Sequence, residues 1–472
     1  MNNRSEIYVD GSWTESSADA MIDVVNPTDE TIISQVPAGS ADDVDVAVRA
    51  ARRAFPGWSG LAPVERSRWL GKLADGLWER REEIARLVSL EVGAPYQEAL
   101  AMHVVEPIAH FSFFADHNES FAFDGEVVDQ TMIVREAIGV VGCITPWNFP
   151  FQAVSLKVSP ALAAGCTVVL KPSEVAPLTA FVLAEVVDAI GFPAGVFNLV
   201  SGIGPVVGEA IASHPEVDMV SFTGSTRAGT RVSELAASGV KRVTLELGGK
   251  SANIILADAN LPAAVENGVS QCFMNAGQTC SALTRMLVPR ELLTQVEQLA
   301  KKAAESYVVG GPFEETSTLG PLVSAAQHDR VRNLIDVGIE EGATLVTGGS
   351  ERPRTHGYFV APTVFSDVNP KMRIAREEIF GPVLCIIGYD SVDEAVEIAN
   401  DSDYGLGGGV WGADQSFAIA VARRIRTGQV AINGGTWNPR APFGGYKHSG
   451  LGREGGEAGF EEFLETKAIL LS

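Results

Sequence analysis

The chain has 472 residues, and its 59 acidic against 36 basic side chains give a formal net charge of −23. This excess of negative charge argues against nucleic acids and anionic membranes as partners, because both repel an acidic surface. A hydrophobic fraction of 46% is typical of a globular protein with a large core. At roughly 150 residues per domain, the length predicts about two or three domains.

The cysteine pattern indicates a reducing compartment. The five cysteines stand far apart, are odd in number and form no C-x-x-C pair, so a disulfide framework is not expected. The N-terminus lacks the apolar core of a signal peptide, and no uncharged apolar run is long enough to cross a bilayer. We therefore expect a cytoplasmic protein. The cysteines are Cys143, Cys166, Cys272, Cys280 and Cys385.

The first part of the chain predicts short strands and then helices. Residues 1–40 alternate β-type runs with turn residues, whereas 41–55 and 63–92 repeat apolar residues at helical spacing. The first of these helices is expected to end just before Pro56. A third helix is expected over about 95–117.

That third helix carries His103, His110 and His117, which are seven residues apart. The spacing places them on one helix face, but neighbours are about 10 Å apart along the axis. They are too far apart to share one metal ion. We expect an ordinary polar helix face and no metal site.

An alternation of strand, loop and helix starts near residue 138. Four apolar runs are each followed by a polar or Gly-rich loop and a helical stretch, which is typical of a parallel sheet with crossover helices. Ligands of such sheets lie at the carboxyl ends of the strands. The expected strands cover 140–144, 167–170, 196–200 and 219–222.

A second α/β unit is expected from about 252 to 433, after Lys250. An apolar run at 467–471 and a strand-like stretch at 127–134 belong to neither unit. They predict either a projecting sheet at a subunit contact or an internal edge hairpin, since an unpaired strand edge is a liability.

Cys280 lies among small and polar residues in the stretch Asn275–Ser281 and follows Gly277. A thiolate in such a setting is a strong nucleophile towards a carbonyl carbon. The alternative is a packing residue, because free cysteines are usually buried.

Two helix starts could bind the phosphates of a cofactor. Gly224-Ser225-Thr226 and Gly202-Ile203-Gly204 offer free backbone N–H groups and the positive end of a helix dipole. Ser225 and Thr226 could equally be plain N-caps, and no complete G-x-G-x-x-G is present. Lys171 and Glu174 could bind ribose hydroxyls, or they could form a surface ion pair.

Two polar residues stand in apolar surroundings. Glu246 lies in an apolar strand before two glycines, and a desolvated glutamate has a raised pKa suited to a general base. Asn148 stands between Trp147 and Phe149 and offers an amide donor for an oxyanion. The alternatives are an outward-facing strand glutamate and a turn asparagine.

In this order, the motifs resemble the NAD(P)-dependent aldehyde dehydrogenase superfamily over nearly the whole chain. The resemblance implies the non-acylating, hydrolytic type, because members that pass the acyl group to coenzyme A generally lack the glutamate at 246. The matching motifs are Pro146–Pro150, Lys171–Glu174, Phe222–Thr226, Leu245–Lys250, Gly277–Cys280, Glu377–Pro382 and Pro442–Gly450.

The resemblance implies a role for each catalytic position. Cys280 would attack the aldehyde, and the Asn148 amide with the Cys280 N–H would hold the oxyanion. Glu246 would activate the water that releases the acid and help to deprotonate the thiol. Lys157 and Glu454 match positions proposed to relay protons from the Glu246 region.

The resemblance also implies binding of NAD, with NADP possible, since Glu174 would repel a 2′-phosphate. The positions matched to cofactor contacts are Ile144, Thr145, Pro146, Trp147, Lys171, Ser173, Glu174, Gly204, Gly208, Phe222, Gly224, Ser225, Glu246, Leu247, Gln327, Glu378 and Phe380.

The implied fold is α/β: a Rossmann-like cofactor domain (1–118 and 138–246), an α/β catalytic domain (247–448) and a small β oligomerisation extension (119–137 and 449–472). The expected activity is oxidation of a small-molecule aldehyde by a homodimer or homotetramer. One alternative is a semialdehyde dehydrogenase for a carboxylated or amino aldehyde, with Arg285 as a charged contact or a packing residue. The other is a non-catalytic protein that keeps the fold.

Overall fold

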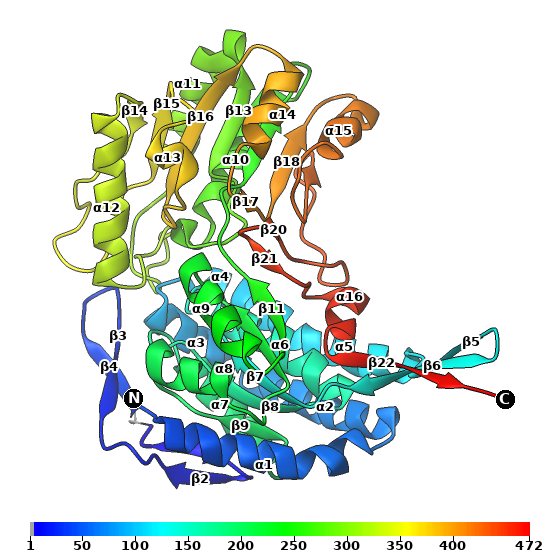
Figure 1. The fold of residues 1–472 in the computed structure, drawn as a ribbon. Helices are drawn as coiled ribbons and strands as arrows, with labels where there is room; N and C mark the ends of the chain where they lie inside the picture. Colours follow the sequence, from blue (N-terminus) through cyan, green and yellow to red (C-terminus); the bar gives the residue numbers. More distant parts are fainter. Residues whose placement is uncertain (1–3) are drawn as a thin grey trace.

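The computed structural model describes residues 4–472, and two large sheets divide it (Figure 1). At the centre of the first sheet, five short strands pair in parallel in the order β9-β8-β7-β10-β11. Two antiparallel strands extend one edge, and β21 pairs antiparallel at the other. The strands are β9 (Phe197–Leu199), β8 (Thr167–Lys171), β7 (Val140–Ile144), β10 (Met219–Thr223), β11 (Arg242–Glu246), β1 (Glu6–Val9), β2 (Ser12–Glu15) and β21 (Gly450–Leu451).

Helices cover both faces of the first sheet (Figure 1), as the apolar character of its strands requires. β7 and β8 are buried at every position. The helical segments are α1 (Ala41–Ser59), α2 (Pro63–Glu79), α3 (Arg81–Glu91), α4 (Tyr96–Leu100), the π-turn η1 (Ala101–Val105), α5 (Glu106–Ser120), α6 (Pro150–Ala164), α7 (Leu178–Ala189), η2 (Gly204–Gly208), α8 (Glu209–Ser213) and α9 (Thr226–Ala237). A separate hairpin joins β3 (Met21–Val25) to β4 (Ile32–Pro37).

The second sheet has the order β14-β15-β16-β13-β12-β18-β19 and is parallel except for the β14–β15 pair. Its strands are β12 (Ala252–Ile255), β13 (Arg285–Pro289), β14 (Thr344–Thr347), β15 (Thr363–Ser366), β16 (Val383–Tyr389), β18 (Gly408–Trp411) and β19 (Ala431–Ile432). Its helices are α10 (Leu261–Phe273), η3 (Met274–Gly277), η4 (Arg290–Leu292), α11 (Leu293–Glu305), α12 (Ala325–Glu340), α13 (Arg373–Arg376), α14 (Val392–Asn400) and α15 (Gln415–Ala422). β17 (Tyr404–Gly405) pairs with β20 (Tyr446–Lys447) beside it.

The run at 467–471 and the stretch at 127–134 meet in a third sheet that projects from the body of the chain (Figure 1). β22 (Leu464–Leu470) pairs antiparallel with β6 (Thr131–Ala137), which continues the hairpin from β5 (Asp124–Val128). α16 (Gly456–Glu461) leads into it. No helix within residues 4–472 is both long and apolar enough to cross a membrane.

Two helix boundaries differ from the expected ones. α1 passes through Pro56 and ends at Ser59, because its last turn is anchored by buried Trp58, whose indole N–H donates to the Leu162 carbonyl (3.1 Å). The lost Pro56 N–H leaves the helix one bond short, but tertiary packing outweighs it. The expected helix over 63–92 is two helices, broken where Arg80 leaves helical geometry (φ −100°, ψ 8°).

The histidine face was also wrongly predicted as polar. The helix over 95–117 is interrupted by the π-turn η1, and His103 and His110 on it are buried. Residues 4–472 bring together no group of three or more His, Cys, Asp or Glu side chains that could hold a metal ion.

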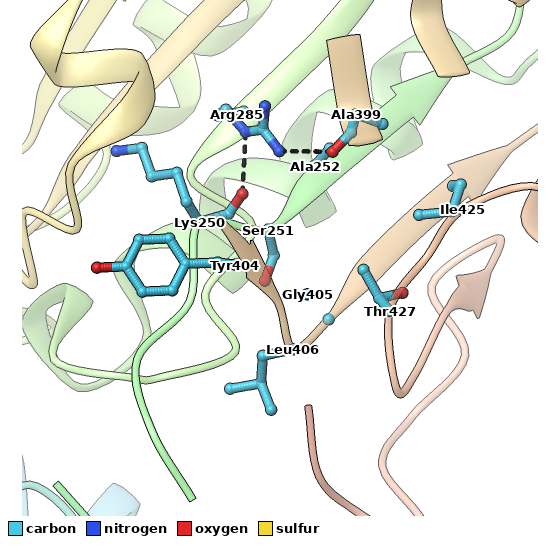
Figure 2. A pocket seen from close by; sticks show the side chains of 11 residues that line it. Lys250, Ser251, Ala252, Arg285, Ala399, Tyr404, Gly405, Leu406, Ile425 and Thr427 are labelled. Atoms are coloured by element: carbon cyan, nitrogen blue, oxygen red, sulfur yellow. Dashed lines mark hydrogen bonds between the residues drawn. The ribbon is translucent and has the colours of Figure 1, made fainter. Parts of the chain in front are cut away.

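Arg285 is a packing residue rather than an exposed charge. Buried at the start of β13, it donates to three carbonyls: Nε to Lys250, Nη1 to Ile398 and Nη2 to Ala399, each at 2.9 Å. Figure 2 shows the bonds to Lys250 and Ala399. The Ile398 and Ala399 carbonyls lie in the final turn of α14, where intrahelical partners are missing. The guanidinium therefore fixes α14 to the second sheet, and Arg285 is not a substrate contact.

We expect Arg285→Met to lower the free energy of unfolding by about 3 kcal/mol or more, because three buried carbonyls lose their donor. Denaturant unfolding measures the difference. The control is Arg290→Met, which removes an exposed pair with Asp390 (2.8 Å) and should change stability by at most about 0.5 kcal/mol. Equal effects of the two substitutions would contradict this assignment.

Candidate active site

Three strands of the first sheet carry expected site residues at their carboxyl ends. Ile144, Lys171 and Glu246 are the last residues of β7, β8 and β11. The chain beyond β11 passes so close to the loop that a Cβ on Gly249 would collide with the Cys280 carbonyl oxygen. The expected location at the carboxyl ends of parallel strands is therefore the observed one.

The loop before Cys280 holds a strained backbone. Asn275 and Ala276 have left-handed φ angles of 52° and 55°, which non-glycine residues rarely adopt, and Gly277 follows with φ 73°. Only glycine fits at 277, since a Cβ there would collide with the Gly381 carbonyl. Strain of this kind persists only where neighbouring contacts enforce it, and it is common at functional sites.

Amide side chains hold that loop in place. The Asn148 amide donates to the Gln278 carbonyl (2.9 Å), and the Asn275 amide donates to the Asn148 carbonyl (2.8 Å). Gln278, which is fully buried, accepts from the Val323 N–H (2.9 Å) and donates to the Asn275 carbonyl (3.2 Å). Sequence reasoning missed the roles of Asn275 and Gln278, although both stand in the stretch that drew attention to the cysteine.

Asn148 keeps a donor for a ligand. Its amide nitrogen carries two protons, and only one is used by the Gln278 carbonyl two residues before Cys280. The side chain is buried. An unused donor held beside a thiol fits the expected oxyanion contact.

Cys280 is half-buried, and its thiol is held in the neutral form. Burial raises the pKa of this thiol, and the nearby carboxyl groups of Glu246, Glu378 and Glu454 raise it further. Because the thiolate is the nucleophile, the free protein needs a base to take the proton.

Glu246 is placed to be that base. It is buried, and neither carboxyl oxygen has a hydrogen-bond partner among the described residues. Burial raises its pKa well above the usual value, Glu454 adds to the rise, and Lys157 and Arg453 oppose it. A Cβ on Gly444 would lie 2.8 Å from its Oε1, so glycine there leaves room at the carboxyl group.

Lys157 and Glu454 form a buried ion pair behind Glu246. The Lys157 ammonium donates to Glu454 Oε1 and to Ser221 Oγ (3.2 Å), and Ser221 is bonded to Thr244 Oγ1 (2.9 Å). Thr244 lies two residues before Glu246 on β11 and so on the same face. A chain of polar groups thus connects the ion pair to the strand that carries the base.

On the other side lie the residues expected to bind the adenosine half of a cofactor. The buried Lys171 ammonium donates to Glu174 Oε2 (3.0 Å) and to the Pro172 carbonyl (2.8 Å). Burial lowers the Lys171 pKa, and Glu174 opposes the shift. A Cβ on Gly208 would lie 3.8 Å from Lys171 Cδ, and one on Gly204 would meet no atom within 4 Å.

Glu378 and Phe380 lie beside the Cys280 loop. Glu378 Oε1 accepts from the Gly249 N–H (2.9 Å), and burial raises the pKa of this carboxyl to about 6. Phe380 has a left-handed φ of 61° and lies edge-on to the Trp147 ring (5.3 Å). The Gln327 amide donates to the Phe380 carbonyl (2.7 Å) and to the Ile379 carbonyl (3.2 Å). Gln327 thereby fixes the strained turn.

The remaining expected cofactor positions serve the local fold. Ser225 is the N-cap of α9 and accepts from the Ala228 N–H (3.3 Å), so the plain capping role is real. Phe222 and Leu247 pack against Gly224 and Gly229. The backbone N–H of Thr145 donates to the Lys171 carbonyl (3.1 Å), which joins the ends of β7 and β8. Ser173 lies in the loop after β8, and Pro146 follows β7.

The raised pKa of Glu246 predicts a pH-dependent stability difference. A pKa above that of the unfolded chain means that the folded protein binds the extra proton, so this stabilisation is lost as pH rises through the folded pKa. Glutamine cannot ionise. Relative to wild type, Glu246→Gln should therefore gain stability between about pH 5 and about pH 8. Denaturant unfolding at both pH values measures this gain, and a constant difference would contradict the assignment.

Comparison with known proteins supports the family expected from the motifs. A model of the aldehyde dehydrogenase family matches residues 13–469. A 3-succinoylsemialdehyde-pyridine dehydrogenase from a Pseudomonas species is 50% identical over 100% of this chain and 99% of its own length.

Solved structures agree with both the family and the α/β fold class. A cysteine-to-alanine mutant of aldehyde dehydrogenase C from Pseudomonas syringae, in complex with NAD+ and octanal, is 53% identical with a TM-score of 0.98 over 99% of this chain and 97% of that one. An aldehyde dehydrogenase from Bartonella henselae is 44% identical, with a TM-score of 0.97 over 100% of both chains. With these matches along nearly its whole length, the chain belongs to the aldehyde dehydrogenase family.

Proposed function

We propose that the protein oxidises an aldehyde to its carboxylic acid with NAD, using Cys280 as nucleophile and Glu246 as base. One observation carries the proposal: a half-buried thiol lies within the electrostatic influence of a buried carboxyl group that has no hydrogen-bond partner among the described residues. An unpaired buried carboxyl is costly, and a base kept ready for proton transfer explains it. A non-catalytic protein would have no use for it.

The residues present fit a dinucleotide. Lys171 and Glu174 would hold the adenosine ribose, and Gly204 leaves open space on that side. Glu378 would hold the nicotinamide ribose, with Phe380 and Trp147 beside it. When bound, NAD supplies the acceptor for the hydride that leaves the aldehyde carbon.

The chain's own residues account for the proton transfers. Glu246 takes the proton from Cys280 Sγ, and the thiolate adds to the aldehyde carbon. The free donor on Asn148 Nδ2 and the Cys280 N–H hold the oxyanion. Glu246 gives up that first proton through Lys157 and Glu454 and becomes a carboxylate again. After the carbon is oxidised, it takes a second proton from the water that cleaves the thioester. Lys157 and Glu454 would pass that proton onward, since their ion pair is joined to β11 by hydrogen bonds.

Glu174 supports NAD as the main cofactor. Its carboxyl, bonded to the Lys171 ammonium (3.0 Å), would repel a 2′-phosphate. Dual use of NADP remains open to a parallel assay with both cofactors.

The relatives point to an aldehyde with an apolar or aromatic chain, since one acts on a pyridyl semialdehyde and another binds octanal. Arg285 does not support the alternative of a carboxylated semialdehyde, because its guanidinium already donates to three backbone carbonyls.

We also propose the division of the chain into a cofactor domain, a catalytic domain and an oligomerisation segment at 119–137 and 449–472. The projecting sheet supports the last, since Ile469 and Leu470 on its edge strand β22 are exposed. A dimer or tetramer would cover them. The five free thiols support a cytoplasmic location.

Replacing Cys280 tests the nucleophile. Cys280→Ala should lower NADH formation from any aldehyde by about a thousandfold or more, because the other four cysteines are buried. Absorbance of NADH at steady state measures it. Cys272→Ala, which removes a buried thiol bonded to the Val383 carbonyl, is the control and should retain turnover. Retained turnover in Cys280→Ala would remove this cysteine from the mechanism.

Replacing Glu246 separates its two proposed roles. If water activation is the limiting role, Glu246→Gln should release a burst of about one NADH per active site and then stall at the thioester. Rapid mixing followed by intact-mass measurement detects the burst and the acylated Cys280. Steady-state turnover at the wild-type rate would contradict the role of Glu246 as base.

A further inference from the structure

Two buried histidines have ring nitrogens that no hydrogen bond explains. His103 is fully buried, and neither of its ring nitrogens has a partner among the described residues. His110 is buried as well; its Nδ1 is bonded to Ser155 Oγ (2.8 Å), and its Nε2 has no such partner. Buried polar groups are nearly always hydrogen-bonded, so these three unpaired nitrogens require a cause. Further along the same segment, His117 Nε2 is buried and unpaired as well.

His103 contacts the residue that follows the proposed oxyanion donor. Its ring stacks on Phe149 (4.4 Å between centroids, 15° between planes), and Phe149 directly follows Asn148 in the chain. His103 is presented by the π-turn η1 (Ala101–Val105). Such turns are rare within helices and are frequent at functional sites. The stack therefore places an unpaired imidazole against the residue that follows the proposed oxyanion donor.

His110 extends the same row away from that site. It stands about 10 Å further along the helix, with its ring edge-on to Trp437 (5.8 Å). Trp437 belongs to the segment between β19 and β20, and Arg440 of that segment lies over the Phe113 ring (5.7 Å). The two histidines thus run from Asn148 towards this segment.

Both imidazoles are neutral. Burial lowers the pKa of His103 to about 3 and that of His110 to about 4. A neutral imidazole has one N–H donor and one acceptor nitrogen and brings no positive charge. It matches a neutral polar group rather than a carboxylate.

We propose that His103, continued by His110, hydrogen-bonds a neutral acceptor such as a ketone or pyridyl group in the chain of the aldehyde substrate. The inference rests on the proposed function, because it places the aldehyde chain alongside Phe149. If the ring served packing alone, phenylalanine would fill the same stack without unpaired nitrogens. A substrate acceptor that bonds to the ring of His103 explains why this position is a histidine.

The test is His103→Phe, assayed with phenylbutanal and with the same aldehyde carrying a ketone next to the ring. We expect kcat/KM for the keto aldehyde to fall about fivefold while that for phenylbutanal stays unchanged, since only the former loses a hydrogen bond. Thermal unfolding should show that the variant is at least as stable as wild type. Equal changes for both aldehydes, or none, would overturn the proposal.

Two further variants sharpen the result. His103→Gln keeps a donor and an acceptor and should restore part of the preference for the keto aldehyde. His117→Phe is the matched control, because this third histidine also has an unpaired buried Nε2 but packs among Phe113, Phe121 and Phe460. This substitution should leave the preference unchanged. A loss of preference in His117→Phe equal to that in His103→Phe would overturn the assignment. If wild type oxidises neither aldehyde, the proposed function itself fails, which is a different outcome.

Discussion

Burial of the Glu246 carboxyl group is the constraint on which the rest of the site depends. A lone carboxylate in an apolar interior is so costly that the group holds its proton instead. Lys157 and Arg453 oppose this rise in its pKa and so favour the ionised form that a base needs. Lys157 is buried in turn, and its hydrogen bonds to Glu454 and Ser221 make its charge tolerable. One base at the end of one strand thus requires polar groups from α6, β10 and the C-terminal segment.

The nucleophile depends on a second constraint, the left-handed run from Asn275 to Gly277. Residues that avoid this conformation are held in it by amide groups, and the Asn148 side chain belongs to the same set of bonds. The bond that fixes the loop therefore also fixes the proposed oxyanion donor. Loss of loop geometry and loss of oxyanion binding should be difficult to separate, because one side chain supports both.

The sequence was sufficient for the strands of the first sheet whose ends carry the motifs, since buried parallel strands read as apolar runs such as Val140–Ile144. It did not give the individual elements between about residue 307 and residue 433. The sequence did not predict that the first helix continues through Pro56, because the hydrogen bond from Trp58 to the Leu162 carbonyl that holds its last turn is a long-range contact. Burial of His103 and His110 was missed for a similar reason: helical spacing shows that residues share a face but not what covers it. No local sequence pattern predicts the hydrogen bonds of Gln278 and Gln327, since their partners are backbone carbonyls or N–H groups that only the fold brings near.

The three carboxyl groups around Cys280 give the site a common electrostatic character. Glu246, Glu378 and Glu454 each raise the pKa of the thiol, and burial raises the pKa of Glu246 and Glu378 as well. Acidic groups close together in a site without water disfavour one another's ionised forms. Ionisation of either the thiol or a carboxyl group therefore makes ionisation of the other less favourable. The free protein therefore keeps its thiol protonated and unreactive. Proton transfer from Cys280 to Glu246 avoids a second negative charge, because the Glu246 carboxylate becomes neutral as the Cys280 thiolate forms. The site therefore favours proton transfer from Cys280 to Glu246 over a permanently ionised cysteine.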